Sequence, residues 1–364
     1  MDNLPVELLN HFDLDLGDLV LISSLNTFWY KNIKSSKSVK ITQQTFFSDS
    51  IIMWIPFLND IDASECLINS TKAKLFKNVH TLDLTSNQVV DVSFLENTYN
   101  LNLSRTKVVD ISALGKVHTL NLSRTKVVDV SALGKVHTLN LSHTKVKDVS
   151  ALGKIYDLDL TGCGNLVNVS ALGNVHILNL SYTNVKDINV SALGNVHTLN
   201  LFKTNIIDVS TFGGVYSLNL SGCLKINNFS CLGNVHTLNL SNTRVLDVSA
   251  LGKVHTLNLS NTNVVDVSAL GNVHTLNLCN TRVLDVSALW GVYNLDISFT
   301  DVENVSALGR VHTLDLTYCY NVDDVSSLDG VHNLRIRGVS KNVKGLSALN
   351  NVPNLEKDMD TNLI

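Results

Sequence analysis

The chain has 364 residues, of which 45% are hydrophobic, and its formal net charge is −4. This composition excludes collagen-like and intrinsically disordered chains, because disorder requires low hydrophobicity and a high net charge. The near-neutral balance gives no support for a general nucleic-acid or membrane-surface binder. The longest apolar run near the start, from Ile51 to Leu58, is far too short for a membrane-spanning helix.

Residues 1–41 carry the pattern of two short helices. Pro5 stands at the start of the first helix, and Asp18 can cap the second. The apolar side chains at helical spacing are Leu8, Leu9 and Phe12 in the first helix and Leu19, Ile22 and Leu25 in the second. By periodicity alone, this small helical domain is equally an N-terminal cap for the segment that follows.

The same segment resembles the F-box. The F-box opening L-P-x-E-L-L is matched by Leu4, Pro5, Glu7, Leu8 and Leu9, its D-L-x-x-L-S segment by Asp18, Leu19, Ile22 and Ser23, and its closing aromatic by Phe28 and Trp29. The stretch between the helices is shorter than in the family. The resemblance implies that a Skp1-like adaptor of a ubiquitin ligase docks on Leu4, Pro5, Leu8, Leu9, Phe12, Leu19, Ile22 and Trp29.

Residues 42–78 are interpreted as a linker and N-terminal cap, because the stretch FFSDSIIMWIPFL is apolar enough to cover an open end. From residue 79 to residue 351 the chain then repeats itself in steps of 19 to 21 residues. The repeats begin at Val79, Thr98, Val117, Val136, Ile155, Val175, Val196, Val215, Val235, Val254, Val273, Val292, Val311 and Val331. Positions within a repeat are counted from these residues. Residues 352–364 are expected to form a C-terminal tail or cap.

Each repeat predicts one strand and one return turn. In H-T-L-N-L-S the leucines alternate with polar residues, which is typical of a strand with one buried face. In D-V-S-A-L-G an Asp or Ser can cap a short helical turn and Gly permits its exit. One repeat buries too little apolar surface to be stable alone, so the repeats must stack. We expect an α/β solenoid with a parallel β-sheet on its concave face and short turns or 3-10 segments outside.

The first eleven positions resemble the leucine-rich repeat frame L-x-x-L-x-L-x-x-N-x-L, most cleanly from Val79 to Val89. These repeats are shorter than usual, and their ninth position is Asn only at Asn87. Most repeats carry Thr there, whose hydroxyl can satisfy buried backbone groups with fewer bonds than Asn. Three carry Cys, namely Cys163, Cys223 and Cys319. They resemble the cysteine-containing repeats found behind F-boxes, and the near-identical copies are similar to proteins of large amoeba-infecting DNA viruses.

Two columns of polar residues have both a functional and a structural interpretation. The second position is His in ten repeats and Tyr in four, which favours a stacked ladder of flat rings over a metal site. The thirteenth position is mostly Asp with some Asn, which favours capping of the outer turn over calcium binding. Since Ser, His and Asp occur in identical columns, no nucleophile has an environment of its own. We expect no enzymatic activity, no metal and no cofactor.

Residues that depart from the pattern on the concave face are the candidate target-binding site. Positions three, five and seven should pave that face, and they are nearly always small and polar. The departures are Ile177 and Phe202 on the face itself, Tyr182 and Lys203 at the variable eighth position beside them, and the pair Phe299 and Tyr318. Aromatic anchors on a polar sheet are typical of a protein-binding hot spot. Neutral drift in a redundant array is the alternative.

Repeats two to four are basic, and the last repeat ends in charge. The basic residues are Arg105, Lys107, Lys116, Arg124, Lys126, Lys135, Lys145, Lys147 and Lys154. Aspartates of the same repeats offset part of this charge, so we interpret the cluster as a solvated face, with a surface for an acidic partner as the alternative. Arg335 and Arg337 on the last good strand, with Pro353 beyond, discourage further strand pairing and are interpreted as a cap.

The recurring acceptor pattern Asn-Leu-Ser would place a glycan on successive strands in a secretory compartment, and the six cysteines show no zinc spacing. Both features favour the cytoplasm, which is the host cytoplasm for a viral protein. We therefore expect a substrate adaptor of an SCF-type ubiquitin ligase, a monomer within a larger complex. Its partners would be a Skp1-like adaptor and an unknown target protein, with no nucleic acid and no membrane. The alternative is a leucine-rich repeat scaffold with no link to ubiquitin.

Overall fold

The computed structural model describes residues 39–40, 59–64, 66–185, 190–339 and 342–357. The chain divides into two compact units, of which unit 1 ends at Asn179 and unit 2 begins at Leu180. The eight predicted adaptor-binding residues, from Leu4 to Trp29, lie outside the described residues. Among the residues that are described, no helix has the length and apolar character needed to cross a membrane.

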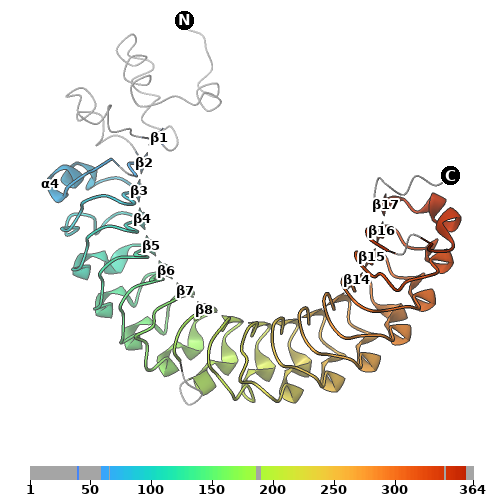
Figure 1. Cartoon of the computed structure of the whole chain (residues 1–364). Coiled ribbons are helices and arrows are strands. Elements are labelled where there is room, and N and C mark those ends of the chain that lie inside the picture. Colours follow the sequence, from blue (N-terminus) through green and yellow to red (C-terminus); the bar gives the residue numbers. More distant parts are fainter. Residues whose placement is uncertain (1–38, 41–58, 65, 186–189, 340–341, 358–364) are drawn as a thin grey trace, which may run out of the picture. The chain divides into compact units, whose positions relative to one another are not determined.

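Unit 1 is a parallel sheet in which each strand pairs with the next one along the chain (Figure 1). Its strands are β1 (Val39–Lys40), β2 (Asp60–Asp62), β3 (Thr81–Asp83), β4 (Asn100–Asn102), β5 (Thr119–Asn121), β6 (Thr138–Asn140), β7 (Asp157–Asp159) and β8 (Ile177–Asn179). Strand β2 lies in the segment interpreted as linker and cap, and its Ile61 stands opposite Leu82 of β3. The helix α4 (Ser70–Ala73) precedes β3 and is capped by Asn69.

Unit 2 repeats the same arrangement. Its strands are β9 (Thr198–Asn200), β10 (Ser217–Asn219), β11 (Thr237–Asn239), β12 (Thr256–Asn258), β13 (Thr275–Asn277), β14 (Asn294–Asp296), β15 (Thr313–Asp315), β16 (Asn333–Arg335) and β17 (Asn354–Glu356). All are parallel and in register, with leucine opposite leucine at the fourth position. The prediction that strand pairing ends at Arg335 and Arg337 is wrong, because β17 pairs with β16 and places Glu356 opposite Arg335. Arg335 contacts both Asp315 and Glu356, and Arg337 contacts Glu356.

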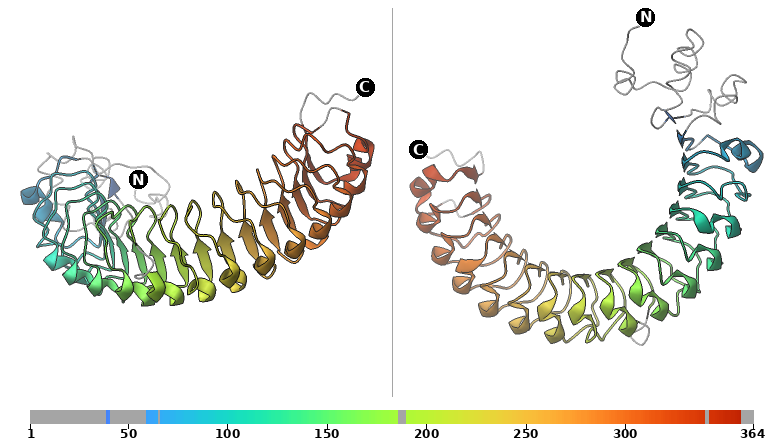
Figure 2. Two further views of the ribbon diagram at one scale, coloured as in Figure 1. Left: turned by 60° about the horizontal axis from the view of Figure 1, so that its bottom comes forward. Right: turned by 180° about the vertical axis from the view of Figure 1, so that it is seen from behind.

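The predicted outer turns are 3-10 segments, on the side of each unit opposite to the strands (Figures 1 and 2). In unit 1 they are η4 (Lys74–Phe76), η5 (Ser112–Lys116), η6 (Ser131–Leu133), η7 (Ser150–Leu152) and η8 (Ser170–Asn174). In unit 2 they are η9 (Ser191–Asn195), η10 (Phe212–Gly214), η11 (Ser230–Asn234), η12 (Ser249–Leu251), η13 (Ser268–Leu270), η14 (Ser287–Gly291), η15 (Ser306–Leu308), η16 (Ser326–Leu328) and η17 (Leu346–Asn351). The sequence-based prediction of fold class is thereby confirmed.

The core of each unit lies between its strands and its 3-10 turns. One complete repeat, that of Val136, buries the side chains at positions one, four, six, eleven, fourteen and seventeen, and each has at most 1% of its surface exposed. The glycine at position eighteen lets neighbouring turns approach each other. A Cβ atom at Gly134 would lie 2.5 Å from the carbonyl oxygen of Ala151 in the next turn, so this column is glycine for packing reasons.

Candidate protein-interaction surface

The rings at the second position form a stacked ladder in each unit, as predicted. In unit 1 the stack runs from His80 to His176, and in unit 2 from His197 to His332, with ring centroids 4.4 to 4.9 Å apart. Tyrosine takes its place in the stack without interrupting it. Within the described part of the chain, no group of three or more His, Cys, Asp or Glu residues is arranged to hold a metal ion.

The aspartates at position thirteen cap the outer turns, which confirms the capping interpretation. The backbone N–H of Ser112 donates to Oδ1 of Asp110 at 3.0 Å, and that of Ser170 donates in the same way to Asn168 at 2.9 Å. The backbone bond from Ser112, followed by the bond from its side chain, holds the pKa of Asp110 below its usual value. Since Asn makes the same backbone bond without a charge, this column is structural.

The ninth position satisfies buried backbone groups in three different ways. The hydroxyl of Thr106 donates to the carbonyl oxygen of Leu103 in its own repeat, at 2.6 Å. The thiol of Cys163 donates to the carbonyl oxygen of Leu141 in the preceding repeat, at 3.1 Å, and burial raises its pKa. The side chain of Asn87 makes three hydrogen bonds to backbone groups. This confirms the expectation that Thr makes fewer bonds at this position than Asn.

The eighth position has a left-handed backbone in every repeat, with φ between 52° and 70°. Its N–H donates to the carbonyl oxygen of the seventh residue in the next repeat, as from Tyr182 to Phe202 at 2.9 Å. Gly and Asn adopt this conformation at the least cost, and they occupy the position in six repeats. Tyr182, Phe299 and Tyr318 hold the same strained conformation with 51%, 52% and 41% of their surfaces exposed.

Three of the four residues predicted around Tyr182 come together in unit 2. The rings of Tyr182 and Phe202 meet edge to face with centroids 5.1 Å apart, and Nζ of Lys203 lies 5.4 and 5.2 Å from those centroids. We call these three residues the aromatic–lysine cluster. Ile177, the fourth predicted residue, begins β8 in unit 1, where it is half-buried opposite Asp157.

Sequence reasoning missed the contribution of Gly222 to this cluster. Gly222 occupies the eighth position of the next repeat, and a Cβ atom there would lie 2.8 Å from Cγ of Lys203 and 3.5 Å from the ring of Phe202. The missing side chain therefore leaves room for the lysine stem. The sequence held a signal for this glycine. Two twenty-residue repeats contain the triplets Thr-Gly-Cys and Ser-Gly-Cys, which place glycine at the variable eighth position.

The second predicted pair, Phe299 and Tyr318, also comes together, with ring centroids 4.8 Å apart. Tyr320, which the sequence did not single out, extends the group, since its ring lies 5.9 Å from that of Tyr318 and 65% of its surface is exposed. Gly338 stands beneath the ring of Tyr318, where a Cβ atom would collide with it. Both aromatic groups of unit 2 thus lie beside a glycine of the following repeat.

No family model matches the chain, and no curated protein matches it. Among solved structures, it is similar to the functional domain of InlJ from Listeria monocytogenes, which includes a cysteine ladder, with a TM-score of 0.60 and 21% identity over 84% of this chain and 73% of that one. It is also similar to a leucine-rich repeat protein of Leptospira interrogans, with a TM-score of 0.63 and 18% identity over 91% and 92% of the two chains. The described chain therefore has the leucine-rich repeat fold.

Proposed function

We propose that this chain is a protein-binding adaptor without catalytic activity, and that the aromatic–lysine cluster of Tyr182, Phe202 and Lys203 captures its partner. The observation that carries the proposal is the exposed ring of Tyr182, held on a left-handed backbone where Asn or Gly costs less. Backbone strain and exposed aromatic surface both oppose the stability of the isolated chain, and both are typical of binding sites. Lys203 adds a cation beside the rings, which suits a partner segment with apolar and acidic side chains.

The test places a photo-crosslinking amino acid at position 182 of the full chain to identify the partner in a cytosolic extract. The purified partner is then titrated by calorimetry. Phe202→Ser restores the usual residue of position seven, and we expect it to weaken binding about thirtyfold, as for the loss of roughly 2 kcal/mol. Val265→Ala, an exposed substitution outside both aromatic groups, is the control and should change the affinity by less than threefold. Equal affinities of the Phe202→Ser variant and the unaltered chain would refute the proposal.

We further propose that the adaptor works in the cytoplasm as the substrate-recognition subunit of an SCF-type ubiquitin ligase. The support is the resemblance of residues 1–41 to the F-box, through which a Skp1-like adaptor would bind. Calorimetry of purified Skp1 with the full chain tests this, with Leu8→Asp as the disrupting variant and Asp13→Asn as the control between the two motifs. Micromolar binding lost only in Leu8→Asp supports the ligase, whereas no binding leaves the alternative, a leucine-rich repeat scaffold.

A further inference from the structure

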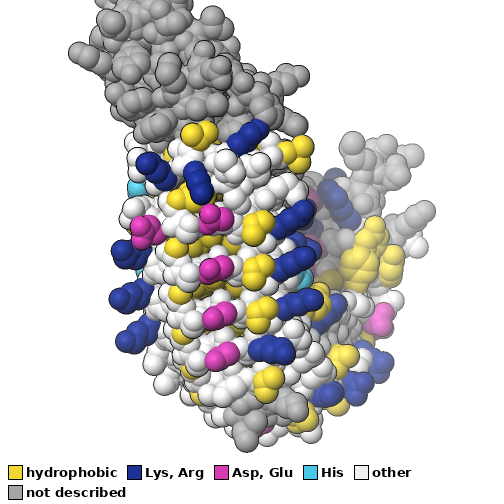
Figure 3. Space-filling view, turned by 90° about the vertical axis from the view of Figure 1, so that its left-hand side faces the viewer, with side chains coloured by type: hydrophobic (Ala, Val, Ile, Leu, Met, Phe, Trp, Pro, Cys, Tyr) yellow, Lys and Arg dark blue, Asp and Glu magenta, His cyan; other side chains and the backbone are white. Residues whose placement is uncertain are grey.

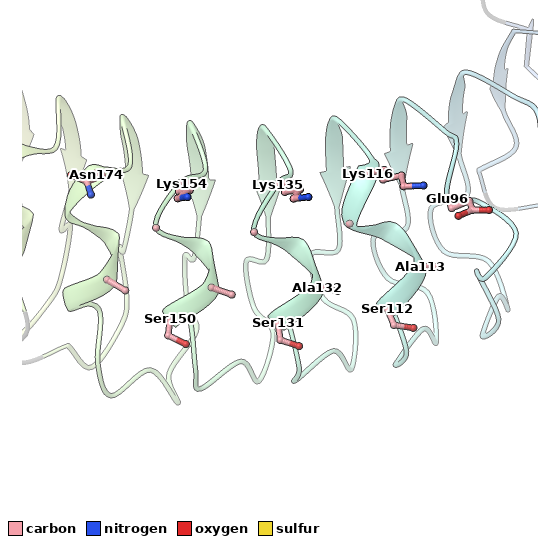
Figure 4. A pocket seen from close by; sticks show the side chains of 15 residues that line it. Glu96, Ser112, Ala113, Lys116, Ser131, Ala132, Lys135, Ser150, Lys154 and Asn174 are labelled. Carbon is pink, nitrogen blue, oxygen red and sulfur yellow. The ribbon is translucent and has the colours of Figure 1, made fainter.

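The outer side of unit 1 has a groove that is separate from the aromatic–lysine cluster. Its volume is about 810 Å³, and we call it the lysine groove. One edge is formed by Lys116, Lys135 and Lys154, and the other by Ser112, Ser131 and Ser150. Figure 4 shows the two rows running parallel across successive repeats. The floor between them consists of the small residues of the A-L-G segments, so backbone and methyl groups are all that an occupant meets there.

The three lysines of this groove form no ion pair among the described residues, although Glu96 also lines the groove, at the end of the lysine row (Figure 4). No ion pair in the described residues includes Lys116, Lys135 or Lys154, and all three side chains are exposed. Figure 4 shows these like charges on successive outer turns, one beside the next. Like charges at neighbouring positions repel and lower stability. An anionic occupant would remove this repulsion.

The surrounding surface favours an acidic ligand over a basic one. Repeats two to four contain seven lysines against the three capping aspartates Asp110, Asp129 and Asp148, and the groove lining adds one acidic residue, Glu96. Figure 3 shows acidic side chains as a central column with basic columns on either side. The aspartates lie next to the serine row, and the backbone N–H groups of those serines donate hydrogen bonds to the aspartate carboxylates. An acidic ligand in the groove would therefore lie along the lysine edge.

Unit 2 provides the same groove with a different charge. A groove of about 500 Å³ is lined there by Ser230, Ser249, Gly233 and Gly252, the same columns as in unit 1. Its basic column reads Asn234, Lys253, Asn272, so one lysine stands where the lysine groove has three. The difference in charge therefore comes from the side chains at the end of each repeat, together with Glu96, which lines only the groove of unit 1.

We propose that the lysine groove binds an extended, acidic segment of a partner protein, independently of the aromatic–lysine cluster. Acidic side chains of that segment would pair with Lys116, Lys135 and Lys154, and its backbone would lie on the glycine and alanine floor. Nucleic acid is the less suited polyanion, since single-stranded binding sites stack bases on aromatic side chains and this groove is lined by none.

The experiment titrates the full chain with a fluorescein-labelled peptide of alternating Glu and Gly, followed by fluorescence anisotropy at low salt. Replacing Lys116, Lys135 and Lys154 together by Gln should weaken binding about tenfold, because exposed ion pairs contribute little each and add over three sites. The control replaces Lys107, Lys126 and Lys145 by Gln, which removes the same charge outside the groove, and should weaken binding less than threefold. Matching thermal midpoints establish that both variants are folded.

Three outcomes would overturn the proposal. The first is no binding of the peptide, and the second is an equal loss of affinity in the two triple variants, which would mean that net charge alone attracts it. The third comes from titrations with a labelled oligouridylate and with phosphatidylserine vesicles. Tighter binding of either probe, lost in the Lys116, Lys135 and Lys154 variant, would assign the groove to nucleic acid or membrane. Binding of the peptide should also vanish near 1 M salt, where the Debye length is about 3 Å.

Discussion

Units 1 and 2 have the same arrangement of strands and 3-10 turns but differ in the side chains on their surfaces. In unit 1, successive repeats are near-copies, and their identical lysines accumulate into rows on the outer side. In unit 2, the corresponding groove has a single lysine, and the two aromatic groups interrupt the polar pattern instead. Copying a repeat therefore multiplies one surface chemistry, whereas departing from the copy creates a local site. The core positions remain apolar and buried in both units.

The largest expected effect tests whether the two cores are equivalent. Leu139 in β6 and Leu257 in β12 are each 1% exposed at the fourth position. Replacing either by Ala should lower the free energy of unfolding by about 2–5 kcal/mol, through lost burial and a cavity. Chemical denaturation measures the loss. The exposed controls Val128→Ala and Val265→Ala should cost less than about 0.5 kcal/mol. A large loss in one unit only would contradict the shared core.

The second prediction separates the first repeat of unit 1 from those that follow it. Oδ1 of Asn87 accepts from the N–H of Ile68 at 2.6 Å, and its Nδ2 donates to the carbonyl oxygens of Ala63 at 2.8 Å and Thr85 at 3.3 Å. Asn87→Ala leaves the first two groups buried and unpaired, so it should cost about 2–3 kcal/mol of unfolding free energy.

The comparison residues for this prediction are Thr125 in unit 1 and Thr262 in unit 2. Each hydroxyl makes one bond, to the carbonyl oxygen of Leu122 or Leu259. Replacement by the isosteric Val should therefore cost only about 1 kcal/mol in either unit. Chemical denaturation of the three variants side by side decides the ranking, and equal losses for Asn87→Ala and Thr125→Val would overturn it.

A third prediction concerns a defect found in unit 1. Thr98 occupies position one, where every repeat of unit 2 has Val, and its buried hydroxyl has no partner among the described residues. Thr98→Val should raise the free energy of unfolding by about 1–2 kcal/mol, since an unpaired polar group leaves the core. Thr98→Ser keeps the hydroxyl and should give no gain. If the two substitutions shift the thermal midpoint equally, the hydroxyl is not the cause.

Much of the backbone structure could be predicted because the same strand and turn pattern recurs in every repeat. The alternation around Leu101 and Leu120 indicated the strand, and the Asp, Ser and Gly columns indicated a short outer turn. Residues that contact across repeats were harder to foresee. The room that Gly222 leaves for Lys203 and the contact of Tyr320 with Tyr318 depend on how neighbouring repeats stack. Position eight looked merely variable, although its mixture of Gly and Asn was the available signal of a left-handed backbone.

A fourth prediction asks whether the aromatic residues of unit 2 serve stability. Phe299→Asn places at the left-handed eighth position the residue that Asn242, Asn261 and Asn280 already provide. The gain from relieved strain should offset the lost contact with Tyr318, so the free energy of unfolding should change by no more than about 0.5 kcal/mol. Denaturation of Phe299→Asn and of Tyr182→Asn measures this. A loss well above that value would make the rings structural and weaken the binding proposal.

The smallest expected effect concerns the stability that the chain loses in acid. It tests whether the lysine rows of unit 1 stabilise the ionised capping aspartates. The bonds from Ser131 hold the pKa of Asp129 below its usual value, and those from Ser268 do the same for Asp266. The folded state therefore binds fewer protons than the unfolded state near pH 4. The stabilisation is complete above the usual pKa of 3.8 and is lost as pH falls through the lower folded pKa.

Replacing Asp110, Asp129 and Asp148 by Asn in unit 1, or Asp247, Asp266 and Asp285 by Asn in unit 2, keeps the capping oxygen and removes the titration. Both triple variants should be less stable than the unaltered chain at pH 7, because Asn lacks the charge that strengthens the serine bonds, and both should lose less stability between pH 5 and pH 3, as measured by urea denaturation. The two should respond equally, because serine hydrogen bonds lead the causes of the lowered pKa values in both units and no lysine contributes. A larger response in unit 1 that salt abolishes would instead mean that its lysines stabilise the aspartates, leaving less of their charge for an acidic ligand.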